Sequence, residues 1–121
     1  MISYSRSNDL FRIIMKGRIN FKDIATFLKQ LEQLKDLPDD MRLLYDIQEA
    51  ELHLSLKEIR KISELAESVT KNSLSVKTAF HVTKPIMTAF SVIFAKSRKP
   101  DHTQRKLFST QASALEWLQH N

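Results

Sequence analysis

Residues 41–58 read MRLLYDIQEAELHLSLKE, and this stretch places a short apolar run before the signature of a helix start. The run Met41–Ile47 is apolar and is ended by charge, which predicts a strand largely buried in a sheet. The sequence SLKE at residues 55–58 fits a capping box, in which the Ser55 hydroxyl accepts from a backbone amide and the Glu58 carboxylate reaches back. A buried strand followed by a capped helix favours an α/β layer fold.

The rest of the chain repeats this alternation of strands and helices. The order β-β-α-β-α-β-α-β-α favours an α/β fold with a mixed sheet of four or five strands flanked by four helices. We expect residues 1–121 to form one domain, with an N-terminal hairpin that turns at Ser7-Asn8-Asp9. The predicted strands cover residues 2–7, 10–19, 41–47, 76–83 and 105–109, and the predicted helices cover 21–37, 55–72, 85–95 and a last segment from 110.

The composition excludes several kinds of protein. The chain has 121 residues, of which 42% are apolar and 27% charged, with no cysteine and one glycine. The lack of cysteine excludes disulfides, thiolate nucleophiles and cysteine-based metal sites. A single glycine cannot supply a phosphate-binding loop or a dinucleotide fingerprint. This glycine, Gly17, lies near the end of the second predicted strand, where we expect a bulge or a close backbone approach.

No stretch of the sequence indicates a membrane span or a secretion signal. Crossing a bilayer takes about 20 apolar residues, and the longest near-apolar run, Ile86–Ala95, is shorter and interrupted by polar side chains. The first residues lack the apolar core of a signal peptide. We therefore expect a cytoplasmic protein.

Positive charge is concentrated in the second half of the chain. The net charge is +5, residues 1–60 carry ten basic and ten acidic side chains, and residues 61–121 carry nine and four. Such a cluster could attract an anionic surface or an acidic partner, or it could be a solvated helix end and loop. Few aromatic residues lie among these charges, so we do not expect nucleic-acid binding. The candidate basic patch comprises Lys96, Arg98, Lys99, Arg105 and Lys106.

No pattern of residues indicates catalysis. The four histidines lie in four different predicted elements, and no His-Glu-x-x-His or Gly-x-Ser-x-Gly motif occurs. The carboxylate pairs belong to a turn, at Asp39 and Asp40, and to a predicted loop, at Glu49 and Glu51. We therefore predict a protein that is not an enzyme, with no catalytic residues, no metal and no cofactor.

Two residues of the opening stretch form a candidate binding site. Asp46 ends a predicted parallel strand, at the carboxyl edge where α/β sheets tend to place ligands. Ser55 opens the next helix, whose N-terminal dipole would stabilise an anion or a phosphoryl group. Lys57 lies close to this helix start and would suit a phosphate. The alternative is that Asp46 caps a turn and Ser55 caps the helix.

The segment Arg42–Asp46, followed by a loop and a helix opening at Ser55, resembles STAS domains, and more specifically the small bacterial SpoIIAA-like proteins. Gly17–Phe21 resembles their glycine-containing second strand entering the first helix, and Thr110–Leu118 resembles their closing helix. The resemblance implies a STAS-like fold. It also implies that Ser55 corresponds to the serine that a partner kinase phosphorylates in anti-sigma-factor antagonists, although Leu54 and Leu56 differ from the usual flanking residues.

Two functions follow from these observations. The first is a non-catalytic regulatory or protein-interaction domain that docks a protein partner or a second copy. The alternative is a carrier or sensor of a lipid or other small apolar ligand, because the predicted helix over Ile86–Ala95 is apolar almost all round. In that helix, Met87 and Val92 are the candidate contacts for a ligand or a dimer partner.

Overall fold

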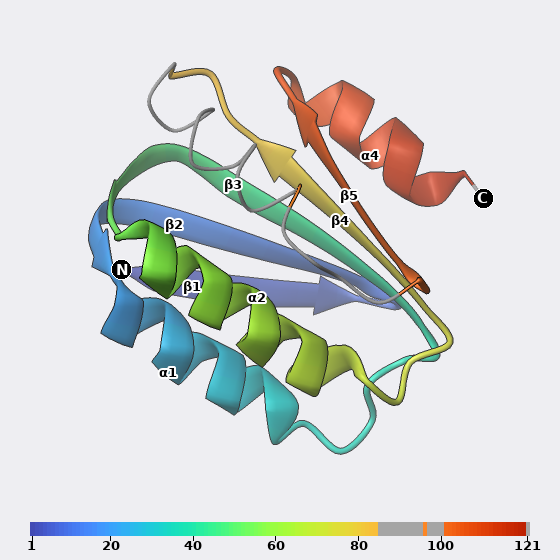
Figure 1. Cartoon of the computed structure of the whole chain (residues 1–121). Helices are drawn as coiled ribbons and strands as arrows, with labels where there is room; N and C mark the ends of the chain where they lie inside the picture. The colour runs from blue at the N-terminus through green and yellow to red at the C-terminus, as the bar shows by residue number, and fades with distance from the viewer. Residues whose placement is uncertain (85–95, 97–100, 121) are drawn as a thin grey trace.

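A computed structural model describes residues 1–84, 96 and 101–120 of the chain (Figure 1). The described part contains five strands and three helices. In chain order the elements are β1 (Ile2–Ser7), β2 (Leu10–Asn20), α1 (Phe21–Glu32), β3 (Asp40–His53), α2 (Leu56–Thr70), β4 (Ser75–His81), β5 (Thr103–Phe108) and α4 (Gln111–Gln119).

The strands form one mixed sheet in the order β1-β2-β3-β4-β5. β1 runs antiparallel to β2, as predicted for the N-terminal hairpin. The pairs β2-β3, β3-β4 and β4-β5 are parallel. The hairpin turns through Asn8, whose φ of 56° lies in the left-handed region that asparagine tolerates. The predicted mixed sheet of four or five strands is therefore confirmed with five strands, and so is its N-terminal hairpin.

Helices cover both faces of the sheet. α1 and α2 lie side by side across one face, here called the front face, and α4 packs on the back face (Figure 1). The larger core fills the space under α1 and α2, and a smaller cluster of Leu44, Ala79, Ala114 and Leu118 lies under α4. In β3 and β4 the side chains alternate between these two cores, with Leu43 and Phe80 in the larger core and Leu44 and Ala79 in the smaller one.

β3 is longer than predicted, because a bulge hides its second half in the sequence. Ile14 pairs with Asp46 and Lys16 with Glu49, so β3 spends one extra residue at this point. The extra residue reverses the alternation, and the positions that face the larger core change from odd to even numbers. Glu49 and Glu51 were predicted to lie in a loop, and this is wrong: both are exposed strand residues.

The backbone conformation at position 17 favours glycine. Gly17 has a φ of 73°, and a Cβ added there would meet no atom within 4 Å. The expected close backbone approach is therefore wrong. The register shift between Ile14 and Lys16 lies just before the glycine, so a bulge does occur nearby. An L-residue at position 17 would be strained by the left-handed backbone.

The helices differ in detail from the prediction. α1 ends at Glu32 instead of residue 37, and Leu34 and Leu37 still pack on the core from the following loop. The described residues contain three helices, whereas four were predicted, and the helix predicted over 85–95 lies outside them. Among the described helices, none combines the length and apolar character that a membrane span requires.

Candidate functional site

The start of α2 is held by the predicted capping box. The Glu58 backbone N–H donates to Ser55 Oγ at 3.1 Å, and the Ser55 backbone N–H donates to Glu58 Oε1 at 2.9 Å. Ser55 and Lys57 are exposed, and the Leu56 side chain between them is 56% exposed although it is apolar. Ser55 is therefore both a structural cap and a surface residue.

Replacing Ser55 separates these two roles. Ser55→Ala removes an acceptor for a helix N–H and should lower the free energy of unfolding by about 0.5–2 kcal/mol. Ser55→Asp should be nearly neutral, because aspartate also caps and its charge suits the helix N-terminus. Urea unfolding of both variants measures this. An unchanged stability of Ser55→Ala would contradict the role of the hydroxyl as the cap.

Asp46 lies away from Ser55, in a cluster on the back face of the sheet. It pairs in register with His81, the last residue of β4, and Asp46 Oδ1 lies 4.0 Å from His81 Nδ1. Gln48 Nε2 lies 3.2 Å from Asp46 Oδ1 and 3.1 Å from His81 Nδ1. A carboxylate only accepts, so the Gln48 amide donates to Asp46, and its role in the contact with His81 Nδ1 depends on the tautomer of the ring. α2 packs on the front face, so Asp46 and Ser55 do not form one site.

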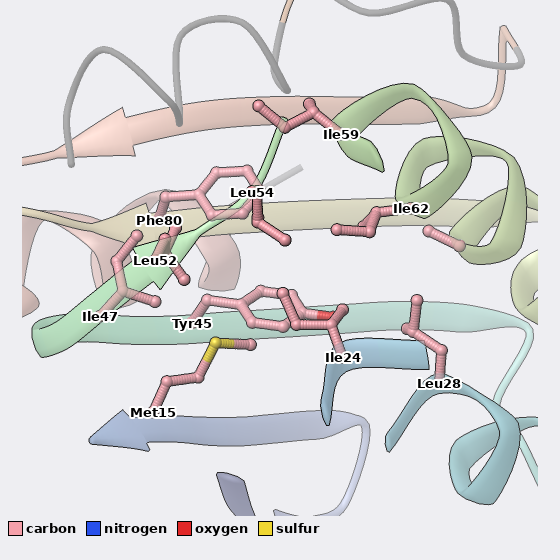
Figure 2. A pocket seen from close by; sticks show the side chains of 11 residues that line it. Met15, Ile24, Leu28, Tyr45, Ile47, Leu52, Leu54, Ile59, Ile62 and Phe80 are labelled. Atoms are coloured by element: carbon pink, nitrogen blue, oxygen red, sulfur yellow. The ribbon is translucent and has the colours of Figure 1, made fainter. Parts of the chain in front are cut away.

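An apolar cavity lies between the front face of the sheet and the two helices α1 and α2 (Figure 2). It has a volume of about 70 Å³, and one wall is the stacked pair of Tyr45 and Phe80, whose ring centres are 5.5 Å apart. The lining side chains are Met15, Ile24, Leu28, Tyr45, Ile47, Leu52, Leu54, Ile59, Ile62, Ala66 and Phe80. Apart from the Tyr45 hydroxyl, the described residues of this lining offer no nitrogen or oxygen atom of a side chain.

A second, smaller cavity of about 30 Å³ adjoins the first and is more polar. The Arg105 guanidinium lines it and donates from Nη1 to Ser63 Oγ of α2 at 3.0 Å. Burial lowers the pKa of Arg105 and raises the pKa of Tyr45 to about 12. Thr103 also lines this cavity, and its Oγ1 is buried with no hydrogen-bond partner among the described residues. A buried hydroxyl without a partner is uncommon in a folded protein.

Of the candidate basic patch, the structure describes Lys96, Arg105 and Lys106. Arg105 points to the front face, while its neighbour Lys106 is exposed and places its Nζ 5.5 Å from the centre of the Phe108 ring. Lys96 is exposed. Arg98 and Lys99 lie outside the described residues, as do the candidate contacts Met87 and Val92.

Three residues of these sites were missed by the analysis of the sequence. Gln48, His81 and Thr103 belong to no sequence motif. The register of β3 and β4 brings His81 to Asp46, and this pairing between distant segments leaves no local signal in the sequence. Within residues 1–84, 96 and 101–120, no group of three or more His, Cys, Asp or Glu side chains could hold a metal ion.

The arrangement of the sheet, with α1 and α2 on one face and α4 on the other, is the SpoIIAA-like fold, as three solved structures show. An uncharacterised protein of the DUF3478 family with a SpoIIAA-like fold, from Shewanella loihica PV-4, is similar over 98% of this chain and 92% of its own, with a TM-score of 0.58 and 19% identity. No family model and no curated protein matches the chain.

The other two structures are of SpoIIAA itself. The anti-sigma factor antagonist SpoIIAA in its unphosphorylated form is similar over the whole of both chains, with a TM-score of 0.59 and 7% identity. The Bacillus cell fate determinant SpoIIAA in its phosphorylated form is similar over 98% of this chain and 100% of its own, with a TM-score of 0.56 and 10% identity. These likenesses confirm the SpoIIAA-like fold expected from the sequence.

Proposed function

We propose that this chain is a cytoplasmic, non-catalytic regulatory domain of the STAS-like type that docks a protein partner through the start of α2. The observation that carries the proposal is the exposed trio Ser55, Leu56 and Lys57, here called the docking surface. A leucine that is 56% exposed beside a cation and a hydroxyl offers apolar contact together with polar specificity. The likeness to an anti-sigma factor antagonist supports this function.

Phosphorylation of Ser55 would regulate such docking. The Ser55 hydroxyl is exposed and lies at a helix N-terminus, where a phosphate is favoured by the helix dipole. The nearby Lys57 adds positive charge. A phosphate there would also place negative charge at the centre of the docking surface, which would change the affinity for a partner. One of the similar SpoIIAA structures is of a phosphorylated form, which supports this expectation.

A charged residue in place of Leu56 tests the docking surface. Leu56→Glu should abolish co-purification of the partner from lysate of the source cell, because an apolar contact is replaced by a charge that must be desolvated. The matched control is Leu74→Glu, since Leu74 is 75% exposed in the loop before β4. The proposal predicts that a protein retained by the wild-type chain is also retained by the control. Loss in both variants, or in neither, would contradict it.

We propose as a second candidate function that the chain carries or senses a small apolar ligand. The cavity lined by Met15, Tyr45 and their neighbours supports this, since ligand pockets are mostly apolar with few polar groups. An empty apolar cavity stays free of water, so an apolar ligand can bind there without displacing ordered water. Chemical-shift changes of the lining methyl groups on addition of 1-hexanol test this function, and unchanged shifts would contradict it.

A further inference from the structure

We propose that the two adjoining cavities together bind a medium-chain monocarboxylate, with its carboxylate between Arg105 and Thr103 and its tail against Met15, Ile24 and Phe80. This inference rests on the second proposed function, ligand binding in the apolar cavity, and names the chemical class of the ligand. The two cavities share the lining residues Leu28, Tyr45 and Ala66, so one molecule can extend from one into the other. In Figure 2 the Tyr45 hydroxyl lies on the side of Leu28, and both residues line the two cavities.

The polar cavity has the chemistry of a carboxylate site. Arg105 brings a half-buried positive charge, and a guanidinium matches the geometry of a carboxylate. The Thr103 side chain is buried to more than nine-tenths, and its Oγ1 has no hydrogen-bond partner in the described part of the chain. A carboxylate oxygen would accept from this hydroxyl. Thr103 therefore indicates that a polar ligand atom belongs in this cavity.

Several described groups line the polar cavity with Arg105. Ser63 Oγ accepts from the guanidinium, the Thr70 hydroxyl donates to the Ala66 carbonyl at 3.0 Å, and Thr78 adds a further hydroxyl group. Glu67, which acts on Arg105 electrostatically, is exposed and therefore well solvated. No carboxylate side chain lines the polar cavity among the described residues, so a bound carboxylate would meet donors there.

The volumes limit the length of the ligand. One water-sized group needs about 10–15 Å³ of such a cavity. The apolar cavity of about 70 Å³ therefore takes about five to seven carbon atoms. The polar cavity of about 30 Å³ takes the two or three atoms of a carboxylate. Hexanoate fits this division, whereas a long-chain fatty acid exceeds it.

The experiment compares hexanoate with 1-hexanol, which has the same number of carbon atoms and no charge. Each is titrated into the full chain and followed by methyl NMR. We expect hexanoate to bind at least tenfold more tightly than 1-hexanol. Thr103→Val replaces an unpartnered hydroxyl by a methyl group of similar size, so the variant should fold. It should weaken hexanoate binding about tenfold and leave 1-hexanol binding unchanged. The control Thr26→Val alters an exposed residue of α1 and should change neither affinity.

A third variant tests where the ligand binds. Ala66→Leu fills the passage between the two cavities and should abolish hexanoate binding. Equal affinity for hexanoate and 1-hexanol, or unchanged hexanoate affinity in Thr103→Val, would overturn the carboxylate site while leaving the apolar-ligand function standing. Binding of neither compound would overturn both. Persistent hexanoate binding in Ala66→Leu would place the ligand elsewhere and overturn the proposal.

Discussion

Phe11→Ala should lower the free energy of unfolding by about 3–5 kcal/mol, which is the usual cost of emptying a phenylalanine site in a core. Phe11 lies in β2, is fully buried and belongs to the larger core under α1 and α2. Its ring centre lies 6.3 Å from that of Tyr4, and the Arg6 guanidinium carbon lies 5.0 Å above it. These packed neighbours limit how far the site can collapse around a cavity. Urea unfolding measures the effect.

The matched control for Phe11 lies on the same strand and faces the other way. Ile14 is 39% exposed on the back face, so Ile14→Ala should cost about 1 kcal/mol or less. A large difference between the two variants follows from the alternation of β2 and from the position of α1 and α2 on one face. Similar losses from both variants would mean that the wrong face of β2 has been assigned to the core.

Leu118→Ala should lower the free energy of unfolding by about 2–5 kcal/mol, as burial of a leucine in a core implies. Leu118 is 1% exposed and, with Ala114, attaches α4 to Leu44 and Ala79 on the back face. Because this cluster is small, the loss of one leucine removes much of the apolar contact of α4. Thermal and urea unfolding should both detect the change, and α4 should lose its protection from amide hydrogen exchange before the sheet does.

Gln119 provides the control for Leu118. It is the next residue of the same helix and is exposed, so Gln119→Ala should change stability by about 0.5 kcal/mol or less. A stable Leu118→Ala variant would mean that α4 does not cover the back face in solution.

Much of the fold could be predicted because its signals are local. The start of α2 illustrates this, since the predicted capping box between Ser55 and Glu58 is present. Helix starts depend on residues three positions apart, and strand faces depend on alternate residues, so both can be found in a short window.

The second half of β3 could not be predicted in the same way. Its residues 49–53 alternate, but in the opposite phase to residues 41–47, because the bulge adds one residue between the two halves. A single period fitted across the bulge therefore fails, and the charged side chains of Glu49 and Glu51 were taken as a loop. Only the pairing with Lys16 and Arg18 of β2 shows that the strand continues.

The candidate sites depend on contacts between distant segments and were predicted less well. Ser55 and Lys57 were found because they belong to a local motif. Arg105 was assigned to a surface patch by its charge, whereas the phase of β5 turns it toward Ser63 of α2. The unpartnered hydroxyl of Thr103 can be recognised only when its surroundings are known.

Site-specific photocrosslinking from the docking surface tests the central claim most directly. A photoreactive phenylalanine analogue at Lys57, which is exposed beside Ser55 and Leu56, is compared in the source cell with the same analogue at Leu74. Docking through the start of α2 predicts one defined protein adduct from position 57 and none from position 74. No adduct from position 57, or the same adducts from both positions, would contradict a docking surface at the start of α2.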